Sequence, residues 1–202
     1  SFQLPTVGYE AICDGIIANG WQLKWSAGIS PNHPLTAAQF AKLARAGCYR
    51  LEFGVESGSD RVLRAMNKRF TVEGAWEMCR DAHAAGIEVV LYLIVGFPGE
   101  TEEDFAATLA AMERFAPHVS RVRSVNGLLL IPNSAVCENP ERYGLTAPDR
   151  TAPGWMRRWR AGDSTPAVRA ARIARLEAKL RELGVPVEFS NRDELLGESQ
   201  DL

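Results

Sequence analysis

Two short segments of the chain combine glycines with carboxylate and hydroxyl side chains. Residues 54–60 read Gly-Val-Glu-Ser-Gly-Ser-Asp, and residues 96–101 read Gly-Phe-Pro-Gly-Glu-Thr, followed by Glu102, Glu103 and Asp104. A glycine loop that binds phosphate depends on free N–H groups at the positive end of a helix. Here carboxylates stand at those positions and would repel phosphate, so they suit a ligand with diol hydroxyls, an amine or a cationic centre. The alternative, that both segments only form turns and helix caps, stays open.

Other kinds of chemistry find little support in the residue types and their spacing. The sequence has neither a Gly-x-Gly-x-x-Gly nor a Walker loop, and Ser57 does not stand in a Gly-x-Ser-x-Gly elbow. Three histidines are scattered, and four cysteines are too widely spaced for a zinc site or a disulfide framework: His33, His83 and His118, and Cys13, Cys48, Cys79 and Cys137. The cysteines are therefore predicted to be small buried hydrophobes in a reducing cytoplasm.

The segment 49–56 alternates in a way that places charges on one face of a strand. Arg50, Glu52 and Glu56 alternate with apolar residues that must face the covering helices. Three ionisable groups against a dry core would be costly, so this face is expected to line a wet or ligand-filled lumen of a partial β/α barrel. Further polar residues fit the same lumen: Gln22, Lys24, Ser26, Glu88 and Tyr92. The alternative is an internal ion-pair network, Arg50 to Glu52 or Lys24 to Glu56, with a structural role.

The elements that position these residues alternate between strand and helix. Strands are predicted at 21–29, 49–56, 88–95 and 121–131, and helices at 35–46, 72–85 and from Thr101 onward. This order is typical of an α/β fold with a parallel sheet, in which ligands bind at the carboxyl ends of the strands. Both acidic segments lie at those ends.

The chain changes character after residue 131. A helix predicted over 166–183 carries an apolar stripe that would pack on the barrel and an arginine-rich face that would be solvated. The alternative for this face is contact with RNA or phosphate. Residues 136–202 are therefore expected to form a C-terminal extension, and residues 1–135 are expected to form the barrel.

The composition limits which other classes of protein the chain can belong to. The 202 residues are 46% hydrophobic and 24% charged with a net charge of −2, which is ordinary for a globular protein and gives no general attraction to nucleic acid or membrane. The longest apolar run, 89–95, is far shorter than the roughly 20 residues of a spanning helix. With no signal-peptide pattern at the start, a cytoplasmic location is expected.

Several segments resemble the radical S-adenosylmethionine (SAM) superfamily, in particular the branch of MiaB-like methylthiotransferases and cobalamin-dependent radical enzymes. They lie in consistent order within about residues 1–135: residues 51–59, 62–63, 66–68, 85–87 and 94–101. The resemblance implies a partial (β/α)6 barrel that holds a [4Fe–4S] cluster and S-adenosylmethionine, with cobalamin as a further candidate cofactor. It also implies that the four strands are the third to sixth of that barrel.

The same resemblance assigns roles to six residues of this chain, none of them catalytic or metal-binding. Glu56 and Ser57 fall where polar groups contact the ribose or methionine part of the cofactor, and Lys68 where a basic residue meets the methionine carboxylate or the ribose. Tyr92 matches a ribose-proximal position. Gly96 falls at a turn beside the nucleoside, and Ile131 falls on a strand whose backbone borders adenine.

The chain departs from the family pattern in two respects. It contains no Cys-x-x-x-Cys-x-x-Cys triplet, although thiolates hold such clusters, and no counterpart of the first two strands. The sequence is therefore expected to be a fragment that contributes part of an S-adenosylmethionine site, inactive alone, of an enzyme that cleaves S-adenosylmethionine reductively. The alternatives are a non-catalytic binding module and an RNA-contacting domain. An exposed first strand at 21–27 is expected to favour self-association unless the segment 12–18 or a neighbour covers it.

Overall fold

A parallel six-stranded sheet forms the centre of the protein. The computed structural model describes residues 2–4, 8–146 and 159–199. The strand order is β1-β2-β3-β4-β5-β8, and every neighbouring pair is parallel. The strands are β1 (Phe2–Gln3), β2 (Trp25–Ile29), β3 (Cys48–Glu56), β4 (Glu88–Val95), β5 (Arg121–Gly127) and β8 (Val187–Ser190). Over the described residues the sheet does not close, and β1 and β8 are its edges.

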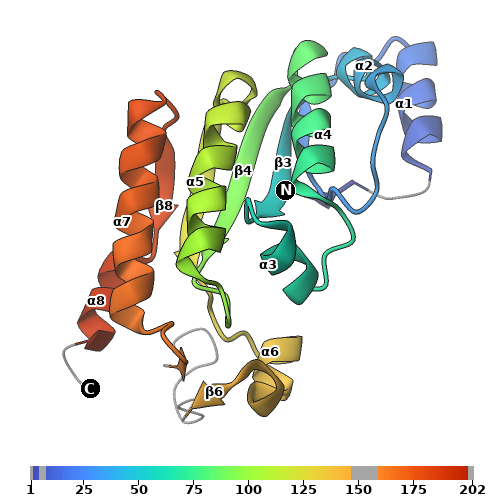
Figure 1. The fold of residues 1–202 in the computed structure, drawn as a ribbon. Helices are drawn as coiled ribbons and strands as arrows, with labels where there is room; N and C mark the ends of the chain where they lie inside the picture. The colour runs from blue at the N-terminus through green and yellow to red at the C-terminus, as the bar shows by residue number, and fades with distance from the viewer. Residues whose placement is uncertain (1, 5–7, 147–158, 200–202) are drawn as a thin grey trace.

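Helices connect successive strands and cover one face of the sheet. The long ones are α1 (Tyr9–Ala18), α2 (Ala37–Arg45), α4 (Val72–Ala84), α5 (Glu102–Phe115) and α7 (Pro166–Glu182). In Figure 1, α4, α5 and α7 stand side by side in front of the sheet, and α3 (Asp60–Ala65), α6 (Ala135–Glu138) and β6 (Leu145–Thr146) gather at the end toward which β3 points. The remaining short elements are α8 (Arg192–Ser199), β7 (Arg160–Ala161) and two 3-10 helices, at Ala116–His118 and Pro140–Tyr143. None of the described helices is long and apolar enough to cross a bilayer.

Side-chain alternation in the central strands separates a dry face from a polar one. On the helix side of β3, Leu51, Phe53 and Val55 are fully buried. They join one hydrophobic core with residues of β4, β5 and the covering helices. The opposite face carries Arg50, Glu52 and other polar groups, as the sequence predicts. The expectation of an α/β fold with a partial parallel β/α barrel is thus confirmed.

The edges of the sheet differ from the prediction. β2 begins at Trp25, where it meets the start of β3, and Trp21 and Leu23 before it are exposed. β1 pairs with β2 through Phe2↔Ala27 and Gln3↔Gly28, so the expectation that the 21–27 strand lies open is wrong. The second difference arises because a two-residue strand leaves no periodic signal in a sequence.

The C-terminal part of the chain packs on the same core. Ile173, Leu176 and Leu180 of α7 are buried in it, and β8 pairs with β5. Arg169 and Arg172 of α7 are buried and do not belong to the solvated face that the sequence predicts, whereas Arg175 and Arg181 are exposed. Two further basic residues pair with carboxylates of α5: Arg175 with Glu102, and Lys179 with Glu113. Four basic residues that could have contacted RNA are therefore buried or paired with carboxylates, which weakens the alternative of RNA contact through this helix.

Candidate functional site

A polar hollow opens at the carboxyl ends of β2, β3 and β4. Its volume is about 380 Å³, and it is lined by Gln3, Gly28, Ile29, Ser30, Glu52, Gly54, Glu56, Lys68 and Tyr92. The alternating polar residues of β3 and β4 supply its carboxylates and its phenol. This is the lumen that the sequence predicts for the polar face of the sheet, and we call it the polar hollow.

The rim of the polar hollow carries an ion pair. The Nζ atom of Lys68 donates to Oε1 of Glu56 at 2.8 Å. Glu56 is a non-glycine residue with φ of 65°, at a point where the register between β3 and β4 shifts. This conformation turns its side chain back over Gly54, where a Cβ would lie 2.9 Å from Oε1 of Glu56. Glycine at position 54 thus leaves the space that the carboxylate occupies.

Deeper in the polar hollow, Glu52 lies against Tyr92. The Tyr92 hydroxyl donates to Oε2 of Glu52 at 2.9 Å, and burial together with this carboxylate raises the pKa of Tyr92. Nε of Arg50 lies 3.6 Å from Oε1 of Glu52. The internal Arg50–Glu52 pair considered from the sequence is therefore present, whereas Lys24 lies over the ring of Tyr49 and Glu56 pairs with Lys68.

Three of the six predicted site residues line the polar hollow, namely Glu56, Lys68 and Tyr92. The other three lie elsewhere. Ser57 is buried, and its hydroxyl contacts the Thr108 hydroxyl at 3.3 Å. The amide of Gly96 donates to Glu100, and its carbonyl accepts from Ser164, so both backbone groups are used inside the protein. Ile131 follows β5 and is 56% exposed.

The second acidic segment does not form an acidic rim, contrary to the prediction. Asp104 accepts from Ser59 at 2.7 Å and from Arg61, and it closes the capping box of Thr101 at the start of α5. Burial would raise the pKa of Asp104, but these hydrogen bonds outweigh it and hold the pKa well below its usual range. Glu100 is buried against Arg172. In the first segment, Asp60 accepts from the amide that begins α4. Asp104 and Glu100 are thus neutralised by arginines that lie far away in sequence, Arg61 and Arg172.

Four residues of the polar hollow were not predicted from the sequence: Gln3, Gly28, Ile29 and Ser30. Gly28 lacks a side chain where Gln3 crosses it, since a Cβ there would lie 2.5 Å from Nε2 of Gln3. The alternation of positions 22, 24 and 26 extends to positions 28 and 30 and could have indicated Gly28 and Ser30, whereas it does not point to Gln3 or Ile29.

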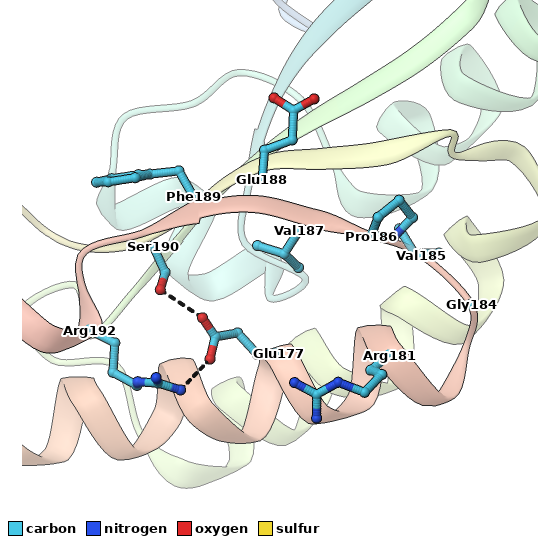
Figure 2. Close-up of a pocket in the computed structure, with 10 residues that line it drawn as sticks. All are labelled: Glu177, Arg181, Gly184, Val185, Pro186, Val187, Glu188, Phe189, Ser190 and Arg192. Carbon is cyan, nitrogen blue, oxygen red and sulfur yellow. Dashed lines mark hydrogen bonds and ion pairs between the residues drawn. The ribbon is translucent and has the colours of Figure 1, made fainter.

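A larger cleft, of about 750 Å³, lies between α7 and β8 at the far edge of the sheet. Figure 2 shows Glu177 between Ser190 and Arg192, with Arg181 nearer the turn at Gly184. Ser190 and Arg192 donate to Glu177, Glu188 pairs with Arg121 outside the cleft, and none of the predicted site residues lines it.

The described residues do not fit an iron–sulfur cluster. Cys13, Cys48 and Cys79 are buried on three different elements. Burial raises the pKa of all three thiols, that of Cys48 to about 12, which disfavours the thiolate that a cluster requires. Over the described ranges, no three His, Cys, Asp or Glu residues are grouped as metal ligands. Any cluster would need ligands outside these residues.

Comparison with known proteins identifies the part of the chain that holds most of the polar hollow. A family profile described as the Radical SAM superfamily matches residues 22–112. Residues 22–112 belong to the Radical SAM superfamily. We call them the radical SAM segment. It contains β2 to β4 with the hollow-lining Glu52, Glu56, Lys68 and Tyr92.

Two curated relatives of the chain are named as enzymes that act on tRNA. A tRNA-2-methylthio-N(6)-dimethylallyladenosine synthase of Mycobacterium bovis is 51% identical over 72 residues, which are 33% of this chain and 14% of that protein. The enzyme of the same name from Geobacter sulfurreducens is 44% identical over 87 residues, 42% of this chain and 19% of that protein. The chain thus spans less than a fifth of either relative. The predicted likeness to methylthiotransferases is confirmed.

Two solved structures share the fold over most of this chain. Coproporphyrinogen III oxidase (HemN) from Escherichia coli, a radical SAM enzyme, has a TM-score of 0.62 at 19% identity, covering 90% of this chain and 38% of that one. The radical SAM methyltransferase TsrM from Kitasatospora setae, solved with cobalamin and a [4Fe–4S] cluster, has a TM-score of 0.57 at 21% identity, covering 73% and 29%. At these identities the likeness shows the fold alone.

Proposed function

We propose that the polar hollow is part of an S-adenosylmethionine site, in which this chain binds the ribose and the methionine end of the cofactor. The observation that supports the proposal most is the convergence of Glu52, Glu56, Lys68 and Tyr92 at the carboxyl ends of radical SAM strands. In β/α folds, ligands bind at that end. In this proposal Ser57 and Gly96 support the turns next to the polar hollow. Ile131 lies on the side of the site that would hold the adenine.

The proposed contacts follow from the chemistry of each group. An ionised carboxylate only accepts hydrogen bonds and can take both hydroxyls of a ribose diol, which suits Glu56. The Lys68 ammonium donates up to three hydrogen bonds and suits the methionine carboxylate. Tyr92 donates to Glu52 and also interacts with Arg123, and its ring lines the polar hollow, where we place it beside the ribose. The Glu56–Lys68 pair keeps both charges compensated until the ligand arrives.

For the whole protein, we propose membership among enzymes that cleave S-adenosylmethionine reductively, acting in the cytoplasm, with cobalamin as a further candidate cofactor. A [4Fe–4S] cluster supplies the electron in that chemistry, and the described residues do not hold one. The burial of three of the four cysteines favours a second candidate, a binding module without a cluster. Sequencing the reading frame upstream of Ser1 separates the two, because an encoded Cys-x-x-x-Cys-x-x-Cys triplet supports the enzyme and its absence supports the module.

Titration of the chain with S-adenosylmethionine, followed by calorimetry or NMR, tests the site itself. We expect weak binding, and Lys68→Met should weaken it by about tenfold to a hundredfold, since a hydrogen bond to a charged group contributes about 1.5–3 kcal/mol. Lys42→Met is the matched control, because Lys42 pairs with Asp14 on the outer helices α1 and α2 at 2.9 Å. Equal affinities of wild type and Lys68→Met would contradict the proposal, and so would a wild-type chain that binds no S-adenosylmethionine.

A further inference from the structure

The turn after β4 rests directly on the C-terminal helix α7. This turn, residues 96–100, begins at Gly96, whose φ is 74°. A Cβ at Gly96 would lie 2.3 Å from Cγ and 2.7 Å from Cδ of Arg169, so the backbone touches the arginine side chain without space between them. The hydroxyl of Ser164 donates to the carbonyl of Gly96 at 2.9 Å. Only glycine fits the position, for its conformation and for this contact.

A buried carboxylate joins the two ends of the turn. Oε2 of Glu100 accepts from the amide of Gly96 at 2.6 Å and from Nη1 of Arg172 at 2.7 Å. The same nitrogen of Arg172 also donates to the backbone carbonyl of Glu100 at 3.3 Å. The side chains of Glu100 and Arg172 are 1% and 8% exposed. The turn is thus held closed by a charge that comes from α7.

Stability alone is a weak reason for such a pair. A buried ion pair usually adds little to the free energy of unfolding compared with apolar residues of similar size, because both charges lose their hydration. Its geometric effect is larger, since an unpaired Glu100 in this place would have to move or take up a proton. Burial raises the pKa of Glu100 even though Gly96 and Arg172 favour the charged form.

The turn continues the strand that lines the polar hollow. β4 carries Tyr92 into the polar hollow and ends at Val95, directly before Gly96. A shift of the turn would therefore move the end of β4 and the ligand side of the sheet. α7 lies outside residues 22–112, so a family match of the strands alone does not include it.

We propose that Arg172 is a positioning residue, which acts through Glu100 to hold the 96–100 turn in the conformation that receives S-adenosylmethionine. Helix α7 is then part of the site although it does not contact the polar hollow. The inference rests on the proposed function for its ligand, whereas the effect of Arg172 on the turn does not depend on it.

Hydrogen exchange and ligand titration on the full chain test the two parts separately. Arg172→Met should make amides of the 96–100 turn exchange about tenfold faster and should weaken S-adenosylmethionine binding about tenfold. Arg172→Lys keeps the buried charge but loses the fork of donors, so it serves if Arg172→Met does not fold and should show the same effects more weakly. Arg175→Met is the matched control, because Arg175 pairs with the exposed Glu102 one turn along the same helix.

Each result decides one of the claims. Unchanged exchange at the turn in both Arg172 variants would overturn the inference, whatever the ligand does. Faster exchange with unchanged S-adenosylmethionine affinity would also overturn it, because the turn would then not belong to the site. A wild-type chain that binds no S-adenosylmethionine would instead overturn the proposed function, and the exchange rates would still decide whether Arg172 orders the turn.

Discussion

Lys68 lies twelve residues after Glu56, and its Nζ atom contacts Oε1 of Glu56 at 2.8 Å across the mouth of the polar hollow. The contact depends on a backbone conformation that residues with a Cβ rarely adopt, φ of 65° at Glu56. Holding a non-glycine residue there costs about 1–2 kcal/mol. A protein that keeps a carboxylate in such a position, where glycine would be easier, gives up stability for a side chain aimed into a pocket.

The first prediction compares two substitutions that both remove this carboxylate. Glu56→Gly should give a higher free energy of unfolding than Glu56→Ala, by about 1 kcal/mol, because only alanine retains a Cβ in the left-handed region. Both variants should lose S-adenosylmethionine affinity to a similar extent. Urea unfolding and ligand titration of the two proteins provide the measurements. If alanine proved the more stable, the left-handed conformation at position 56 would be wrong.

The second prediction concerns the glycine that packs the first acidic segment onto α5. A Cβ at Gly58 would lie 2.6 Å from Cα of Thr108 and 2.7 Å from Cβ of Ala111. Gly58→Ala should therefore lower the free energy of unfolding by about 1–3 kcal/mol through overpacking. At Gly74 in α4, the added Cβ would meet only Thr71 at 3.4 Å, so Gly74→Ala should raise stability, by up to about 1 kcal/mol. Denaturant midpoints of the two variants should move in opposite directions.

Local signals in the sequence predicted the helices and strands well. Features that depend on contacts between distant residues could not be predicted in this way. Thr36 and Thr101 form the capping boxes that begin α2 and α5, and strand 88–95 has the predicted bounds. Each of these depends on residues close together in the chain. The alternation along 49–56 likewise indicated which side chains enter the polar hollow.

What the sequence could not provide were the partners of charged groups. Glu100 and Arg172 are 72 residues apart, so no spacing rule joins them, and the acidic segment looked free to meet a ligand. The family resemblance places Ser57 at the cofactor, but in the structure its hydroxyl is buried against the hydroxyl of Thr108, 51 residues away. The β1 strand was missed because two residues pair with β2 without any pattern of their own.

The third prediction is a pH dependence that follows from Asp104. Its pKa is held below the usual range by hydrogen bonds from Arg61, Ser59 and Thr101 that outweigh the effect of burial. A carboxyl whose pKa is lower in the folded protein stabilises the fold above its unfolded pKa of about 4, and this stability is lost as the pH falls toward the folded value. Asp104→Asn should lower the free energy of unfolding at pH 7 by about 2 kcal/mol and flatten its decline below pH about 4.

Glu73→Gln is the control for Asp104. Glu73 forms an ion pair with Arg114 at 2.7 Å, but both side chains are more than half exposed, so its removal should change stability little. Equilibrium unfolding at several pH values between 2 and 7 compares the three proteins. If the free energy of unfolding fell as steeply at low pH in Asp104→Asn as in wild type, another carboxyl would be responsible for the pH dependence.

The fourth prediction follows from the burial of the cysteines. Thiolates react, and burial raises the pKa of Cys13, Cys48 and Cys79, so these thiols should react slowly with a disulfide reagent in the native chain and fully in denaturant. Cys137 is partly exposed and should react first. Cys137→Ser should then remove the fast phase and leave the other three unchanged. Rapid native labelling of Cys48 or Cys79 would contradict this, because it would require the core between β3 and α4 to open.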